Sequence, residues 1–496
     1  MTTSTGRGTV LDKSRFAIKD ESRYRKVTIV IIMMGVMMSA VDTTAVVLGL
    51  PVIMEDLNTD IIGVIWVLMG YLFVITILGT QVGRIGDMLG RVKMYNLGFA
   101  VFTLGSLFCG LASNGPELIG FRLVQGVGGA LISSNSGAII ADTFSFRERG
   151  KAFGYTGLGF SVGAVLGILV GGIFVTFLNW RYIFFINIPV GIAATAAGYL
   201  LLQERSPRIK AKLDLVGMTL LGVGLFLILL ATTNIAGEGY TSASGLQVVV
   251  GAVLIVAFVL WEKRYPAPVL DLTLMRSRIF SASVFASFFQ ALASYAVIFL
   301  VIMYLQGPRG LSPFDASLLL IPGYVLGGFV APFAGRLSDR MGARVIATLG
   351  LCLQAGAIFV YSTLALDTSL VVVVLGSVLS GAGTACFFPA NTSAVMASAP
   401  PKAYGVSAGL LRTLSNLGMV SSFALAILLA SLSIPRDLAF QIFLGVGGIQ
   451  EALAAAYIDG MHAALLGSLS LIVVAIVLSA IRGKEARTQK SHPGPS

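Results

Sequence analysis

The chain has 496 residues, of which 56% are hydrophobic and only 11% are charged, and its formal net charge is +11. Its mean hydropathy is +0.90, and its apolar residues form continuous runs rather than alternating with polar ones. This composition excludes a soluble globular protein and a membrane β-barrel, and it predicts an all-α integral membrane protein.

Fourteen apolar runs of about 20 residues each are long enough to cross the hydrocarbon core of a bilayer. They lie at 27–50, 62–82, 94–112, 117–141, 152–177, 182–202, 213–234, 246–262, 279–305, 314–335, 345–365, 369–397, 404–431 and 462–482. We therefore expect a cytoplasmic tail (1–26), an N-terminal six-helix bundle (27–202), a linker with two extra transmembrane helices (203–278), a C-terminal six-helix bundle (279–482) and a second cytoplasmic tail (483–496).

The distribution of charge indicates the topology. If the N-terminus is cytoplasmic, the inside segments hold 29 Lys and Arg residues and the outside loops hold 3. Positive charge marks cytoplasmic loops, so we expect a multi-pass plasma (cell) membrane protein with both termini inside. The basic charge then reflects topology and anionic lipids rather than nucleic acid. The 3 cysteines are scattered, and neither a disulfide framework, a metal site nor a cofactor is expected.

The first helix carries an acidic residue, Asp42, well inside an apolar run. An intramembrane charge costs about 2.5–3.5 kcal/mol on insertion scales, so this carboxylate is a functional candidate. Arg122, in the fourth helix, lies at a similar depth, which allows an ion pair that binds and releases a proton. A purely structural ion pair is the alternative. Met34 and Met38 precede Asp42 at a four-residue spacing, which suits either lipophilic cations or ordinary helix packing.

A charged loop recurs in the two halves of the chain. GRIGDMLGRVK at Gly83–Lys93 returns as GRLSDRMGAR at Gly335–Arg344, and the two aspartates are 252 residues apart. Eight expected helices separate the copies, so both face the same side. Two helices, at 213–234 and 246–262, are additional to a six-plus-six arrangement, and we interpret them as a spacer facing lipid. Two-fold repeats of this kind build many secondary transporters.

The two loops are expected to act as conformational latches. In the first copy, Asp87 can accept hydrogen bonds from the N-terminal amides of a neighbouring helix and pair with arginine, while glycines at 83, 86 and 90 permit a tight turn. The expected latch residues are Gly83, Arg84, Asp87, Gly90, Arg91, Gly335, Asp339, Arg340 and Gly342.

Two glycine-containing motifs follow in the fourth and fifth helices. The fourth reads Arg122-Leu-Val-Gln125-Gly126-Val-Gly128. The fifth has glycines mostly four residues apart, a spacing that lets helices approach closely. Its motif glycines are Gly154, Gly163, Gly167, Gly171 and Gly172.

Later helices offer candidates for a substrate cavity. The helix at 279–305 presents aromatic and amide side chains at helical spacing, and aromatic faces hold planar or cationic compounds. Core packing is the alternative. The expected cavity residues are Met34, Met38, Asp42, Gln125, Phe288, Gln290, Tyr295, Phe299 and Arg412. The outside segment 433–461 is either surface-lying or re-entrant, and the sequence favours neither.

Together these motifs resemble the major facilitator superfamily, and within it the fourteen-helix drug:proton antiporter family. Both loop copies match the family's loop motif, and the Arg122 motif matches that of its fourth helix. The fifth-helix glycines match its antiport motif, with Ile168 in place of a proline. AVDTTAVVLGLP at Ala40–Pro51 and NWRYIFFINIPVG at Asn179–Gly191 resemble further family patterns.

The resemblance implies a monomeric secondary active transporter that exports hydrophobic or cationic drugs in exchange for protons by alternating access. Its partners would be a small-molecule substrate, protons and membrane lipids. Two alternatives stay open: the same fold exporting a lipid or metabolite, or without obligatory proton coupling, and a non-transporting membrane sensor. An enzyme is not expected, because the chain has only 2 histidines, no second buried acid beside Asp42 and no nucleotide-binding Gly-x4-Gly-Lys-Ser/Thr pattern.

Overall fold

A computed structural model of the protein describes residues 20–144, 146–208, 212–266, 274–398, 404–433 and 451–483. These residues fold into helices without any strand, and they include 14 spans long and apolar enough to cross a membrane. The expected all-α membrane fold is confirmed.

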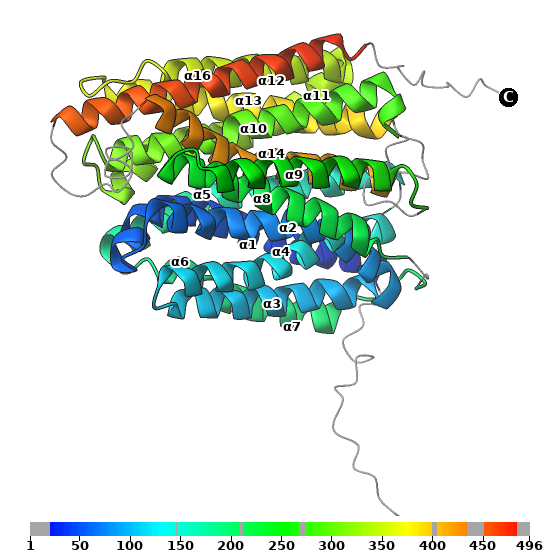
Figure 1. Cartoon of the computed structure of the whole chain (residues 1–496). Coiled ribbons are helices and arrows are strands. Elements are labelled where there is room, and N and C mark those ends of the chain that lie inside the picture. Colours follow the sequence, from blue (N-terminus) through cyan, green and yellow to red (C-terminus); the bar gives the residue numbers. More distant parts are fainter. Residues whose placement is uncertain are drawn as a thin grey trace, which may run out of the picture.

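The helices of each half lie side by side, with the N-terminal half drawn mainly in blue and cyan and the C-terminal half from green through yellow to red (Figure 1). The first half comprises α1 (Glu21–Asp56), α2 (Ile61–Leu89), α3 (Arg91–Leu111), α4 (Gly115–Thr143), α5 (Phe146–Phe177), α6 (Tyr182–Phe185) and α7 (Asn187–Leu201). The linker contains α8 (Leu215–Glu238), α9 (Ser242–Glu262) and a short 3-10 turn (Leu274–Arg276). The second half comprises α10 (Arg278–Gln306), α11 (Pro313–Met341), α12 (Ala343–Tyr361), α13 (Leu370–Ser398), α14 (Tyr404–Ser433) and α16 (Glu451–Ile481).

Two expected elements differ from the sequence interpretation. The sixth span is interrupted at Ile186, so that α6 and α7 together make one crossing. The last helix begins at Glu451, so the final part of the expected outside segment belongs to α16. Residues 434–450 of that segment lie outside the described residues.

A single glycine forms the turn in each repeated loop. Gly90 (φ +114°) joins α2 to α3, and Gly342 (φ +96°) joins α11 to α12, a conformation that glycine adopts without strain. The expectation that Gly83 and Gly86 share the turn was wrong, because α2 continues through both. Gly86 instead lets α4 come close, since an added Cβ would lie 3.0 Å from Cγ of Asn135. We call the end of the bundle that carries the two turns the motif side, and the opposite end the far side.

The glycines of the fifth-helix motif serve two packing surfaces. Three of them face α1: Gly163, Gly167 and Gly171. Gly172 faces α11, and an added Cβ at Gly154 would meet no atom within 4 Å. An added Cβ at Gly167 would lie 2.7 Å from the carbonyl oxygen of Val41, the residue before Asp42. The motif therefore holds α5 against the part of α1 that carries the buried acid.

The two halves meet along α5 and α11 and along α2 and α14. On the far side, Nε2 of Gln306 donates to the carbonyl oxygen of Leu48 at 3.1 Å. The backbone N–H of Phe314 donates to Oγ1 of Thr176 at 3.0 Å. These bonds join α1 to α10 and α5 to α11 near the ends of the helices.

The two additional helices lie at the seam between the halves (Figure 1). α8 packs against α9, against α2 of the first half and against α14 of the second. The ring of Phe226 lies 5.5 Å from that of Trp66, and Leu221 belongs to a buried cluster with Leu410 and Leu414. The interpretation as a lipid-facing spacer is therefore incomplete, because α8 contacts both halves.

Candidate functional site

Asp42 lies in the middle of α1 and is completely buried, with 0% of its surface exposed. Its helix is held by close packing with α5 and by contacts with α4 and α7. A buried carboxylate must be paired and hydrogen-bonded, since an isolated charge in such surroundings is very costly.

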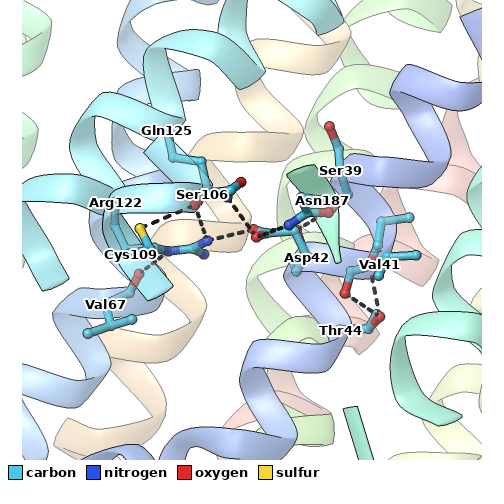
Figure 2. A network of polar contacts seen from close by, with 12 residues as sticks. Ser39, Val41, Asp42, Thr44, Val67, Ser106, Cys109, Arg122, Gln125 and Asn187 are labelled. Carbon is cyan, nitrogen blue, oxygen red and sulfur yellow. Dashed lines mark hydrogen bonds and ion pairs between the residues drawn. The ribbon is translucent and has the colours of Figure 1, made fainter. Parts of the chain in front are cut away.

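The partner expected from the sequence is present. Nη1 of Arg122, also 0% exposed, lies 2.5 Å from Oδ2 of Asp42. The other carboxylate oxygen accepts hydrogen bonds from Nε2 of Gln125 at 2.8 Å and from Nδ2 of Asn187 at 3.3 Å. Figure 2 shows these side chains converging from α4 and α7 on Asp42 of α1.

Arg122 is fixed by further contacts besides the ion pair. Its Nε donates to the carbonyl oxygen of Val67 at 2.9 Å, and Nη1 also donates to Oε1 of Gln125 at 2.6 Å. The guanidinium lies 4.5 Å from the centre of the Tyr71 ring, within cation–π range. Its Nη2 has no hydrogen-bond partner among the described residues. The cation is thus held chiefly by polar groups of α1, α2 and α4.

Gln125 extends the network to α3. Its Nε2 also donates to Oγ of Ser106 at 2.7 Å, and Sγ of Cys109 lies 3.9 Å from its Oε1. Sequence reasoning missed Ser106 and Asn187 as members of the site. The signal for Asn187 was available, because it is an amide within an otherwise apolar stretch; a single serine such as Ser106 carries none.

The polar network lies at the junction of five helices, α1, α2, α3, α4 and α7. Removing one partner of a buried ion pair leaves the other charge uncompensated, which is strongly destabilising for that conformation. Protonation of Asp42 has the same electrostatic consequence for Arg122 without changing the covalent structure. A role of this ion pair in proton coupling stays a prediction.

Most of the expected cavity residues are enclosed by protein in this conformation. Exposed fractions of 3% or less are found for Met38, Asp42, Gln125, Gln290 and Phe299. The partly buried ones are Met34, Phe288 and Tyr295. The ring of Phe299 packs 6.1 Å from that of Phe423, which agrees with the core-packing alternative. A role for these residues in substrate binding stays a prediction.

Arg412 differs from the other expected cavity residues because its side chain is exposed. Its Nη1 donates to the carbonyl oxygen of Ser133 in α4, so it joins the C-terminal half to the N-terminal half.

The first repeated loop forms a charge network on the motif side. Nε of Arg91 lies 2.7 Å from Oδ1 of Asp87, and its Nη1 lies 2.6 Å from Oδ1 of Asp142 at the end of α4. Arg84 donates to the carbonyl oxygen of Lys212 in the linker at 3.3 Å. In the second loop, Gly335 lies within α11, Arg340 is exposed, and the side chain of Asp339 is outside the described set.

Comparisons with known proteins agree with this architecture. The model of the Major Facilitator Superfamily matches residues 32–423. The riboflavin transporter RibZ of Clostridioides difficile (strain 630) is 30% identical over 403 residues, which cover 80% of this chain and 86% of that protein. The tetracenomycin C resistance and export protein of Streptomyces glaucescens is 30% identical over 409 residues, covering 82% and 76% respectively.

Two further proteins extend the comparison. The multidrug transporter protein MdtP of Bacillus subtilis (strain 168) is 30% identical over 392 residues, covering 78% of this chain and 72% of that protein. The crystal structure of a bacterial homolog of the human lysosomal transporter Spinster superposes with a TM-score of 0.65 at 18% identity, covering 92% of this chain and 97% of the other. The fold, the two-fold repeat and these matches establish that the chain is a membrane transporter, not an enzyme, and belongs to the major facilitator superfamily.

Proposed function

We propose that the protein is a proton-driven exporter of hydrophobic, often cationic, compounds across the plasma membrane, with both termini in the cytoplasm. The observation that supports this most is the fully buried ion pair of Asp42 and Arg122. A carboxylate enclosed among transmembrane helices, with an arginine as counter-charge, is typical of proton pathways in transporters.

In this proposal, the proton acts on the contact between α1 and α4. When Asp42 is ionised, its pairing with Arg122 holds the two helices together. When Asp42 takes up a proton, the attraction falls, while Arg122 keeps its bonds to Val67 and Gln125. The two protonation states then favour different conformations of the N-terminal half, which is the differential stabilisation that coupling requires.

The names of two relatives support export of hydrophobic compounds, since one is a tetracenomycin C resistance and export protein and another a multidrug transporter. A second candidate is a metabolite carrier without obligatory proton coupling. It is favoured by similarity to a riboflavin transporter and by Ile168, which stands where the related antiporters have a proline.

Transport by purified protein in proteoliposomes under an imposed pH gradient tests the proposal. Ethidium and tetraphenylphosphonium serve as cationic probes and riboflavin as a neutral one. We expect the wild type to accumulate at least one probe only when the gradient is present. Asp42→Asn should keep downhill flux but lose gradient-driven accumulation by about tenfold or more.

Asp459→Asn is the matched control, because Asp459 is an exposed acid within a spanning helix. It should behave as the wild type does. Gradient-driven accumulation by Asp42→Asn at the wild-type level would reject the coupling role. Wild-type flux that ignores the gradient would favour the uncoupled carrier.

A further inference from the structure

The second half of the protein repeats the helix packing of the first half. An added Cβ at Gly98 of α3 would lie 2.9 Å from the backbone nitrogen of Ile132 in α4. An added Cβ at Gly350 of α12 would lie 2.6 Å from the backbone nitrogen of Phe387 in α13. The α3–α4 and α12–α13 pairs therefore pack in an equivalent way, which relates positions in these helices of the two halves.

This correspondence places neutral residues where the first half has its ion pair. Aligning Gly128 with Gly383, which make the equivalent contacts, puts Ser377 at the position of Arg122. Applied to α1 and α10 as well, the 252-residue spacing of the two turn glycines would relate Asp42 to Ser294. In this alignment the C-terminal half has the packing glycines but neutral residues at the positions of both charges.

A neutral hydrogen-bonded cluster, formed by Gln290, Ser294 and Gln354, occupies this part of the C-terminal half. Oε1 of Gln354 accepts from Nε2 of Gln290 at 2.8 Å and from Oγ of Ser294 at 3.0 Å. Gln354 is 2% exposed and Gln290 is 3% exposed, whereas Ser294 and its neighbour Tyr295 are only partly buried. The cluster therefore extends from the interior of the half to an accessible edge.

One hydrogen-bond donor of this cluster has no acceptor among the described residues. Nε2 of Gln354 is buried and has no hydrogen-bond partner among the described residues. Buried amide groups are nearly always hydrogen-bonded, and an unsatisfied one is unfavourable. A molecule bound at the cluster could supply the acceptor atom that Nε2 of Gln354 lacks. No carboxylate of the described residues bonds to the cluster, so a cation would find no counter-charge there.

We propose that the Gln290–Ser294–Gln354 cluster is a binding subsite for the transported compound and takes a neutral acceptor, such as a carbonyl or imide oxygen, through Nε2 of Gln354. This inference rests on the proposed transport function and adds a substrate class to it. The N-terminal half then supplies the titrating charge, while the C-terminal half selects organic compounds that carry a carbonyl group.

Substrate selectivity of Gln354→Met tests the subsite, because methionine has a similar shape and no hydrogen-bonding group. The probes are riboflavin and tetracycline, which carry carbonyl groups, and ethidium and tetraphenylphosphonium, which carry none. We expect the apparent affinity for the carbonyl compounds to fall about five- to tenfold, the loss of about one hydrogen bond, with the cations changed less than about twofold.

Gln247→Met is the matched control, because Gln247 is another membrane-helix glutamine whose Oε1 lacks a partner, on α9. It should change neither class of probe. Equal effects of Gln354→Met on both classes would overturn the subsite and indicate a structural amide or one that binds water. A wild type that carries only the cations would overturn it as well. In either case the gradient dependence and its loss in Asp42→Asn remain a separate readout for the proposed function.

Discussion

Glu204 accepts a hydrogen bond from the backbone N–H of Arg91 at 2.7 Å, and its other oxygen accepts from Val92 at 3.2 Å. This carboxylate, which follows α7, therefore caps the N-terminus of α3. The sequence suggested both a capping role and an arginine partner for Asp87. The pairing with the side chain of Arg91 is present, whereas the cap comes from Glu204. The charge network at the first loop is thus built from three separate segments: the loop, the end of α4 and the linker.

Glu204→Ala should lower the stability of the protein by about 0.5–2 kcal/mol, because it removes the acceptor for two N-terminal amides of α3. Glu204→Gln should cost less, since it keeps an acceptor and loses only the charge. The midpoint of thermal unfolding in detergent measures both. Glu55→Ala is the control, because Glu55 is an exposed acid near the C-terminal end of α1, away from the cap of α3. An unchanged midpoint for Glu204→Ala would contradict the capping role.

Asp87→Asn should impair transport more than Asp339→Asn. Asp87 pairs with Arg91, which also reaches Asp142, whereas the second loop has Ala343 where the first has Arg91. We expect a loss of about fivefold in initial transport rate for Asp87→Asn, corresponding to about 1 kcal/mol for a partly exposed pair, and less than about twofold for Asp339→Asn. Equal losses at equal expression would count against this ranking.

Gly167→Ala should disturb the proton site through packing. The added methyl group would lie 2.7 Å from the carbonyl oxygen of Val41, so α1 and α5 must separate beside Asp42. Overpacking of this kind costs about 1–3 kcal/mol, and both the thermal midpoint and the transport rate should fall. Gly154→Ala, in the same motif, is the control because its added Cβ meets no atom within 4 Å. The packing argument fails if the two variants behave alike.

Much of the fold could be predicted from the sequence, because each crossing needs a long apolar run and the loops carry a repeated, charged signature. The positions of Gly90 and Gly342 followed from the same repeat. The break at Ile186 and the continuation of α2 through Gly83 depend on neighbouring helices, which a single run of residues does not reveal. The path of α8 across the seam likewise depends on which helices offer a matching surface.

The ion pair of Asp42 and Arg122 could be predicted, since two charges at similar depth in apolar helices need each other. The hydroxyl of Ser106 could not, because neutral polar residues are common in membrane helices and their roles depend on distant partners. The amide of Asn187 stands out in an apolar stretch, but the sequence does not show that its partner is Asp42. For the same reason, the sequence pattern places Gln290 with the aromatic cavity residues rather than with Gln354, its hydrogen-bond partner in α12.

The most direct test of the account is the proton movement that accompanies substrate transport through Asp42. Proteoliposomes without an initial pH gradient would contain a pH-sensitive dye, and a transported probe would be added outside to wild type and to Asp42→Asn. We expect the internal pH to change when the probe is added to wild-type vesicles. In Asp42→Asn vesicles we expect no pH change, although the variant still carries the probe downhill. A pH change of wild-type size in Asp42→Asn would contradict the account.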